Sequence, residues 1–441
     1  MKNILVLGAG LVSKPGVTYL LKQKNIFVTV ASRTVSKAEN LIKGFSNGKA
    51  IQLNVEDEKH LAELIKANDI IVSLLPWVHH LKVAKLCLKH NKHMATTSYV
   101  SDDMKKLYDE AKSKNLLFLN EIGVDPGIDH MSAMKIIDEV YEKGGKVIHF
   151  YSYCGGLPAP EDNDNPFGYK FSWSPKGVVL ASRNSAKFLE NGKIVEIEGK
   201  NLFLNYRIEE IKGLGKFEVY PNRNSLPYKD LYNLKDAQTV MRGTYRNLGW
   251  CDTLKKMVDL GLINEEKQNN LNGITYRKMI ADIVGAKDDS SLEQKVAEKL
   301  KLDTNSEIIK RFEWLGLFSN KKVPDFDNHL DILSELLQEK LVFKNKEKDM
   351  IILQHKFTVE NTDKTKDLIT STLIDFGEAL KESSMARTVS LPLAIGVRFM
   401  AEGKFNLTGV QIPIHKQIYQ PVLKELETLG IKMEENKHKL S

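Results

Sequence analysis

With 441 residues, the chain is too long for a single hydrophobic core, and its length predicts two or three domains. Its content of hydrophobic residues, glycine and proline excludes a largely disordered or fibrous protein. The formal net charge of +7 is spread over many lysines and glutamates instead of forming a basic stripe, which disfavours nucleic acid as a partner and favours a small anionic substrate.

The cysteines and the hydropathy pattern bear on the compartment. Cys87, Cys154 and Cys251 are far apart and show no CxxC or metal-type spacing, so we expect neither a disulfide scaffold nor a metal site. No apolar run approaches the roughly 18 residues that a membrane span needs. We therefore expect a soluble protein of a reducing compartment, the cytoplasm.

The first predicted element is a buried strand followed by a glycine turn. The apolar run at residues 4–7 leads directly into Gly8-Ala9-Gly10-Leu11-Val12-Ser13, and Pro15 falls in the first turn of the next helix. The first glycine permits a tight bend, and the second lets the backbone approach a pyrophosphate at the helix N-terminus. The third small position is Ser13 rather than glycine. A dinucleotide-binding loop is predicted, with a purely structural turn as the alternative.

The second strand, at residues 27–31, completes a βαβ unit, and the residues after it bear on the cofactor. An NAD site usually has Asp or Glu here to bind the ribose hydroxyls. This chain instead has Ser32-Arg33-Thr34, a guanidinium and two hydroxyls suited to a 2′-phosphate. We expect NADP, with NAD as the alternative if Arg33 only lies on the surface.

Apolar strands continue to alternate with helices over the first 125 residues. Strands are predicted at 50–53, 69–76, 93–98 and 116–120. This rhythm predicts an α/β fold with a Rossmann-type, doubly wound parallel sheet, whose strands should line the cofactor crevice with their carboxyl ends. Leu75, Thr97 to Tyr99, and residues 121–127 fall at such ends.

After residue 125 the pattern of predicted strands and helices changes. Strand-like segments at 147–153, 193–197 and 217–220, with a long loop at 155–168, predict a second, α+β domain. Helical patterns then prevail. We expect a dinucleotide-binding domain at 1–125, completed by 387–441, an α+β domain at 126–250 and 346–386, and a helical insertion at 251–345.

Three side chains are candidates for proton chemistry. By topology, Tyr99 and Asp125 fall near the nicotinamide end of the crevice. Tyr99 can donate a proton, and Asp125 can act as a general acid or base if burial shifts its pKa suitably. Capping the turn before Pro126 is the alternative role of Asp125. Cys154 is a third candidate, with core packing as the alternative.

Basic side chains near turns are candidates for carboxylate binding. Arg223, Arg242 and Arg246 can each grip a carboxylate in a bidentate fork, and surface ion pairing is the alternative. His79, His80 and His130 have no metal-type partners, so structural roles are expected. The absence of a GxSxG elbow and of a Walker loop leaves hydrolase and NTPase functions without support.

These features resemble the L-glutamate-forming saccharopine dehydrogenases, a family also called saccharopine reductases. The resemblance runs through nearly the whole chain. Besides the glycine loop it is carried by TTSYVS at 96–101, NEIGVDPGIDH at 120–130, SYCGGLPAPE at 152–161, NPFGYKFSWS at 165–174, YPNR at 220–223, RGT at 242–244 and GVQIPI at 409–414.

The resemblance implies an oxidoreductase of lysine biosynthesis or degradation that interconverts saccharopine with L-glutamate and 2-aminoadipate 6-semialdehyde, using NAD(P). In the reductive direction the glutamate amine condenses with the aldehyde, and the imine takes a hydride from the nicotinamide. It also implies a homodimer and a second domain that serves substrate binding and dimerisation. A related imine-reducing enzyme, such as carboxyspermidine dehydrogenase, and a non-catalytic NADP-binding protein are the alternatives.

The resemblance also implies roles for single residues. Asp125, Tyr99 and Cys154 would lie nearest the reacting centre. The residues implied in substrate binding are Ser98, Tyr99, Asp125, Arg223, Thr244, Tyr245 and Arg246. Those implied in cofactor binding are Gly8, Gly10, Leu11, Val12, Ser13, Ser32, Arg33, Thr34, Asn54, Val55, Leu75, Thr97, Ser98 and Val124. The chain departs from the family pattern at Asn54, where fungal members tend to have Asp, and at Asn247, where a Tyr is common.

Overall fold

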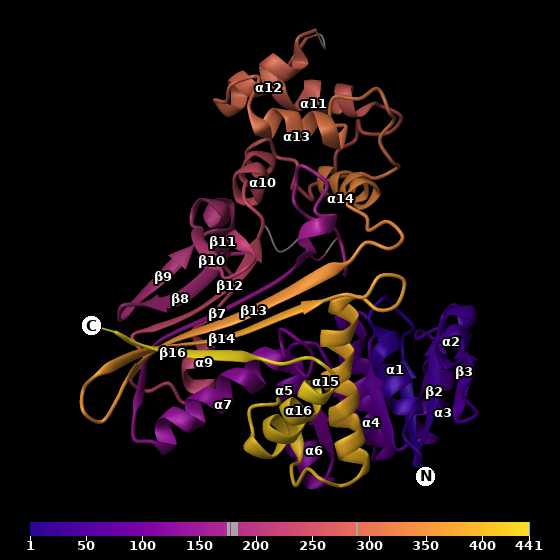
Figure 1. The fold of residues 1–441 in the computed structure, drawn as a ribbon. Coiled ribbons are helices and arrows are strands. Elements are labelled where there is room, and N and C mark those ends of the chain that lie inside the picture. The colour runs from indigo at the N-terminus through magenta and orange to yellow at the C-terminus, as the bar shows by residue number, and fades with distance from the viewer. Residues whose placement is uncertain (174–176, 178–183, 288–289, 441) are drawn as a thin grey trace. The chain divides into compact units, whose positions relative to one another are not determined.

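The computed structural model describes residues 1–173, 177, 184–287 and 290–440 (Figure 1). The chain divides into two compact units, one formed by Met1–Val147 with Leu353–Ser441 and the other by Ile148–Ile352. The boundary falls inside two strands, β7 (Lys146–Pro158) and β13 (Asp349–Glu360). The three-part division expected from the sequence stays a prediction.

A seven-stranded sheet forms the centre of the first unit, with the order β15-β6-β5-β4-β1-β2-β3 and parallel pairing throughout. Its strands are β1 (Lys2–Leu7), β2 (Ile26–Ser32), β3 (Gly48–Gln52), β4 (Ile70–Ser73), β5 (His93–Thr96), β6 (Leu117–Leu119) and β15 (Gly409–Gln411). The central strands are continuous apolar runs because both of their faces are covered, and residues 4–7 are at most 1% exposed. The predicted Rossmann-type parallel sheet is confirmed.

Helices of the first unit follow the strands as expected for a doubly wound fold. They are α1 (Ser13–Leu21), α2 (Val35–Ile42), α3 (Glu58–Lys66), α4 (His80–His90), α5 (Asp102–Lys105), α6 (Tyr108–Ser113), α7 (Ile128–Glu142), α15 (Ser384–Ala401) and α16 (Lys416–Thr428), with a 3-10 turn η1 (Trp77–His79). Side-chain caps mark several N-termini: Asp57 accepts from the His60 N–H and Ser101 from the Met104 N–H.

Helix α15 packs against α1, as Figure 1 shows, although nearly the whole chain separates them in sequence. The contact is very close at Gly16, whose N–H donates to Ser390 Oγ at 3.0 Å. A Cβ at this position would lie 2.7 Å from the Ser390 carbonyl oxygen. Gly16 thus permits the close approach of the two helices, and with β15 it brings the C-terminal segment into the first unit.

The second sheet is mixed, with the path β10-β11-β12-β7-β13-β14-β16 and the hairpin β8-β9 paired beside β12. Its strands are β7 (Lys146–Pro158), β8 (Ala186–Glu190), β9 (Lys193–Ile197), β10 (Arg207–Ile211), β11 (Gly215–Pro221), β12 (Thr239–Arg246), β13 (Asp349–Glu360), β14 (Lys366–Phe376) and β16 (Glu434–Leu440). The loop expected from Gly155 begins only after Pro158. The strand continues because Gly155 fits against the Tyr245 backbone, where a Cβ would lie 2.7 Å from a carbonyl oxygen.

The second unit also contains the helical segment predicted after residue 250. The helices of this unit are α9 (Pro227–Leu231), α10 (Trp250–Asp259), α11 (Tyr276–Val284), α12 (Leu292–Leu300), α13 (Glu307–Leu315) and α14 (His329–Lys340), with 3-10 turns η2 (Pro160–Asp162) and η3 (Gly199–Leu204). Thr275, Ser306 and Asn328 cap α11, α13 and α14 through their side chains. Among the described residues, no helix combines the length and hydropathy that crossing a bilayer requires.

Candidate active site

The glycine loop between β1 and α1 has the geometry of an anion-binding turn. Gly8 has a φ of +111°, and a Cβ there would lie 2.9 Å from the Leu74 carbonyl oxygen, so glycine is required. A Cβ at Gly10, by contrast, would meet no atom within 4 Å, which leaves open space in front of the loop. Ser13 Oγ accepts from the Gly10 N–H at 3.0 Å and donates to the Gly8 carbonyl at 3.3 Å. The serine thus braces the turn, and α1 begins at Ser13, two residues before Pro15.

Residues after β2 and β3 form the second group of predicted cofactor residues. Ser32 ends β2, and Arg33 and Thr34 follow it on the surface. Within the described part of the chain, the Arg33 guanidinium pairs with no carboxylate. Asn54 is exposed and accepts from the Glu56 N–H through its side chain, and Val55 beside it is half-buried. An exposed cation free of protein carboxylates suits a phosphate ligand.

Carboxyl ends of the neighbouring strands β4 and β5 carry Leu75, Thr97 and Ser98, all of them half-buried. Leu75 lies two residues before η1. Thr97 packs against the loop at Gly123, where a Cβ would lie 3.1 Å from the Thr97 Cβ. Ser98 Oγ lies 2.8 Å from Nε2 of the buried His80. These positions agree with the predicted edge of the sheet.

Tyr99 and Asp125 are in contact in the first unit. Tyr99 Oη donates to Asp125 Oδ1 at 3.0 Å, and neither side chain is fully buried. The loop that carries Asp125 is held by backbone hydrogen bonds from Gly123 N to Pro126 O and from Ile128 N to Gly123 O, each 2.8 Å long. Gly127, with a φ of +147°, touches Gly123 so closely that no side chain fits. Asp125 therefore stands on a rigid turn, next to the buried Val124.

A buried hydrogen-bonded pair, Glu121 and His130, joins the two loops that carry Tyr99 and Asp125. Glu121 Oε1 accepts from the Val100 N–H at 2.8 Å, and its Oε2 lies 2.8 Å from His130 Nε2. His130 is fully buried at the start of α7. Glu121 also adopts a φ of +56°, which is uncommon for a residue with a side chain. The structural role expected of His130 is therefore to hold Glu121.

In the second unit, Cys154 and Thr244 are paired neighbours on the parallel strands β7 and β12. Both are half-buried. Because side chains alternate along a strand, Thr244 and Arg246 share one face of β12, whereas Tyr245 points to the other. Tyr245 is fully buried there and packs edge-on against Tyr153 and Phe217. Its role in substrate binding stays a prediction.

Arg246 is a buried cation surrounded by aromatic rings. Its exposed fraction is 5%, and its guanidinium lies over the rings of Tyr169, Trp250 and Tyr220 at 4.8, 5.4 and 6.0 Å. NH1 donates to the Tyr245 carbonyl at 2.8 Å, whereas Nε has no partner among the described residues. Buried cations are normally paired with an anion. The described residues thus leave the buried Arg246 guanidinium without a paired carboxylate.

The two other candidate arginines have different environments. Arg223 is exposed, with a φ of +51°, in the turn after β11. Arg242 is buried, and its NH1 donates to Tyr228 Oη at 2.8 Å while the guanidinium lies 4.6 Å from the same ring. Arg242 is thus held by protein groups.

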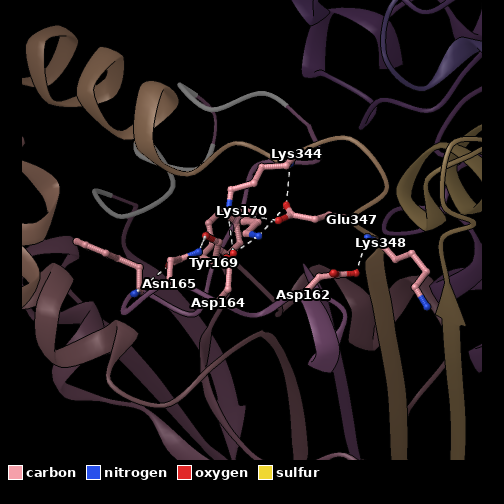
Figure 2. Close-up of polar contacts among 9 residues, drawn as sticks. Asp162, Asp164, Asn165, Tyr169, Lys170, Lys344, Glu347 and Lys348 are labelled. Atoms are coloured by element: carbon pink, nitrogen blue, oxygen red, sulfur yellow. Dashed lines mark hydrogen bonds and ion pairs between the residues drawn. The ribbon is translucent and has the colours of Figure 1, made fainter.

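A cluster of charged side chains fixes the segment after β7, and sequence patterns gave no sign of it. Lys170 is only 3% exposed, and Nζ lies 2.7 Å from both Asp164 Oδ1 and Glu347 Oε2, as Figure 2 shows. Lys344 binds the second oxygen of Asp164 at 2.8 Å. Hydrogen bonds from Lys170 and then from Lys344 lower the pKa of Asp164 to about 2. The cluster joins the segment at 164–170 to the one at 344–347 and so holds Tyr169, which touches Arg246.

Within the described residues, no group of three or more His, Cys, Asp or Glu side chains is placed to hold a metal ion. Cys87, Cys154 and Cys251 are free. Of the NPFGYKFSWS motif at 165–174, residue 174 lies outside the described residues.

Comparison with known proteins identifies the family. The saccharopine dehydrogenase NADP binding domain matches residues 4–119, and the saccharopine dehydrogenase C-terminal domain matches residues 123–431. The chain belongs to the saccharopine dehydrogenase family. A saccharopine dehydrogenase [NADP(+), L-glutamate-forming] of Schizosaccharomyces pombe is 41% identical over 444 residues, which cover 99% of each chain. The corresponding Saccharomyces cerevisiae protein is 41% identical over 98% of this chain and 99% of its own length.

Solved structures and longer relatives agree with this placement in the saccharopine dehydrogenase family. The structure of saccharopine dehydrogenase (L-Glu forming) from Saccharomyces cerevisiae superposes with a TM-score of 0.92 at 39% identity, covering 99% of this chain and all of that chain. The mitochondrial alpha-aminoadipic semialdehyde synthase of Bos taurus is 37% identical over 98% of this chain but only 47% of its own length. The predicted family is confirmed.

Proposed function

We propose that this protein is an NADP-dependent oxidoreductase of lysine metabolism that interconverts saccharopine and water with L-glutamate and 2-aminoadipate 6-semialdehyde. The observation that carries the proposal is the match, over nearly the full length of both chains, to proteins named as NADP(+)-dependent, L-glutamate-forming saccharopine dehydrogenases. The fold agrees along the whole chain. The same comparisons support NADP as the cofactor.

The chain's own residues fit NADP. The open space at Gly10 leaves room for a pyrophosphate at the start of α1, held by the loop from Gly8 to Ser13. Arg33, flanked by Ser32 and Thr34, supplies a cation for the 2′-phosphate. The remaining cofactor contacts are assigned to the residues Asn54, Val55, Leu75, Thr97, Ser98 and Val124. When bound, NADP+ would supply the hydride acceptor for oxidation of the saccharopine carbon that becomes the aldehyde.

Tyr99 and Asp125 are proposed to handle the protons. Oxidation of saccharopine converts its secondary amine to an imine, with loss of the N–H proton. Water then adds to the imine carbon, the C–N bond breaks, and the electron pair stays on nitrogen, which leaves as the glutamate amine. Asp125, hydrogen-bonded to Tyr99, is suited to take a proton from the attacking water and return it to the leaving nitrogen. Cys154 is the third proposed residue near the reacting atoms.

Arg246 is proposed to bind one carboxylate of the substrate, because its guanidinium is buried and pairs with no carboxylate of the described residues. Arg223, Thr244, the backbone of Tyr245, and Ser98 with Tyr99 are the other proposed substrate contacts. A substrate with three carboxylates needs several such donors.

We also propose a homodimer located in the cytoplasm. Ile194, Leu204 and Ile208 of the second unit are exposed apolar side chains that a subunit interface would cover. The three free cysteines agree with a reducing compartment. Light scattering behind a sizing column tests the dimer.

The enzymatic proposal is tested by supplying purified protein with saccharopine and either NADP+ or NAD+. We expect nicotinamide absorbance to rise with NADP+ and to rise much more slowly with NAD+. An Arg33→Asp variant, which carries the opposite charge at the 2′-phosphate position, should reverse or abolish this preference. If neither cofactor is reduced, the proposed function is wrong.

A further inference from the structure

His80 lies outside every predicted set of functional residues, yet it contacts one of them. It begins helix α4, is 5% exposed, and bridges two neighbouring strand ends. Nδ1 lies 2.8 Å from Oγ of Ser73, which ends β4, and Nε2 lies 2.8 Å from Oγ of Ser98, which follows β5. The ring therefore links a buried serine to a serine proposed to bind ligand.

The hydrogen bond between Ser73 and His80 determines which nitrogen of the His80 ring carries the proton. Ser73 is fully buried, and among the described residues its hydroxyl has a single hydrogen-bond partner, His80 Nδ1. A buried hydroxyl proton without an acceptor is costly, so the Ser73 hydroxyl donates to Nδ1. Burial, together with the neighbouring charge of His79, lowers the pKa of His80 to about 4, so the ring is neutral at pH 7. The neutral ring then carries its proton on Nε2.

The protonated Nε2 faces two oxygens, and the closer one is Ser98 Oγ. Thr96 Oγ1 is 3.4 Å away and gives its own proton to the Ser73 carbonyl at 2.8 Å. Ser98 Oγ thus accepts from His80, and the Ser98 proton has no other partner among the described residues. A chain of three hydrogen-bonding groups leaves the half-buried Ser98 hydroxyl as a donor.

We propose that His80 is a positioning residue that sets Ser98 as a hydrogen-bond donor to a carboxylate of the amino-acid substrate. The proposal rests on the proposed function, in which Ser98 binds that substrate. A hydroxyl held as a donor favours an anionic oxygen, whereas the opposite ring tautomer would present an acceptor suited to an amine. His80 would therefore contribute to the choice of an anionic partner over a diamine such as putrescine.

Kinetics of paired variants test the role. His80→Met removes the ring donor, whereas His80→Gln can place an amide N–H near the position of Nε2. We expect His80→Met to raise the KM for saccharopine about 10- to 100-fold, the range for a hydrogen bond to a charged group, with smaller effects on kcat and on the KM for NADP+, which Ser98 is also proposed to contact. His80→Gln should recover most of the loss. In a Ser98→Ala background, His80→Met should add nothing further.

The matched control is His355→Met, because His355 is another fully buried histidine of the same unit and lies 2.8 Å from the hydroxyl of Ser132. We expect it to leave the KM for saccharopine within about twofold, since its effect is on stability. Unchanged saccharopine KM in His80→Met, or losses that add to those of Ser98→Ala, would overturn the proposal. So would a rise in the KM for NADP+ instead of that for saccharopine.

The tautomer can be measured independently of activity. Side-chain nitrogen NMR, with the His80 signal assigned by its loss in His80→Gln, should show the proton on Nε2 in the wild type and a mixture of tautomers in Ser73→Ala. Ser73→Ala removes a single oxygen, which keeps the proposal testable if His80→Met does not fold. A wild-type proton on Nδ1 would overturn the proposal. If saccharopine is not turned over at all, the proposed function fails, and the spectrum alone still shows whether His80 sets Ser98 as a donor.

Discussion

Replacing Arg246 by Met should separate stability from substrate binding. The substitution removes the contacts of the guanidinium with three aromatic rings and its hydrogen bond to the Tyr245 carbonyl. At roughly 0.5–1 kcal/mol per ring and about 1.5 kcal/mol for the hydrogen bond, these contacts contribute about 3–5 kcal/mol. Burying an ion that has no counter-ion costs several kcal/mol, which is of similar size. Because Met keeps the apolar stem, we expect the free energy of unfolding to change by no more than about 1 kcal/mol or to rise.

Substrate binding should respond in the opposite sense. Removing one partner of a buried charge pair costs about 2–5 kcal/mol, so the KM for saccharopine should rise by about 30-fold or more. Urea unfolding and steady-state kinetics of Arg246→Met measure the two effects. Arg242→Met on the same strand is the control for stability: it breaks a hydrogen bond to Tyr228 Oη and should lower the free energy of unfolding by about 1–3 kcal/mol. A strongly destabilised Arg246→Met protein with an unchanged KM would show that Arg246 is structural.

Further outcomes follow from the first unit. Gly16→Ala places a Cβ 2.7 Å from the Ser390 carbonyl and should cost about 1–3 kcal/mol in urea unfolding, whereas Gly10→Ala, which meets open space, should keep its stability but bind NADP+ more weakly in a titration. His80 has a pKa lowered from 6.5 to about 4, so its unfolded form takes up a proton first, and stability should fall as the pH drops from 6.5 towards 4, by about 3 kcal/mol in all. Unfolding curves of wild type and His80→Gln across this range should converge, and parallel curves would refute the assignment. Arg33→Ala should raise the KM for NADP+ about tenfold or more without changing that for NAD+, and an equal rise for both would place Arg33 away from the 2′-phosphate.

Local chemistry explains which parts of the fold could be predicted from the sequence. Continuous apolar runs indicate the Rossmann-type sheet, and Gly8, which must adopt a positive φ, indicates the glycine turn. Both features could therefore be predicted. The role of Ser13 could not be predicted, because its hydroxyl closes the turn onto the Gly10 N–H, a contact that the sequence pattern alone does not indicate. The extension of β7 through Pro158 depends on its partner β12, and pairing partners cannot be deduced from a single segment.

The residues of the candidate site could be predicted from the sequence only where a motif places them on one loop or at neighbouring strand ends. Tyr99 and Asp125 meet because β5 and β6 are adjacent, which the strand rhythm implies. The cluster around Lys170 escaped prediction because its partner Glu347 is 177 residues away in the chain. His80 escaped because its significance depends on two serines from different strands. Contacts of this kind require the folded chain.

Product analysis tests the central claim most directly. Purified protein should convert saccharopine and NADP+ to L-glutamate and 2-aminoadipate 6-semialdehyde, with one NADPH formed for each glutamate, as chromatography of the amino acids against nicotinamide absorbance would show. Release of lysine with 2-oxoglutarate would mean that the other C–N bond of saccharopine is oxidised, and absence of any NADPH would mean that the substrate is a different compound. Either result would contradict the proposed function.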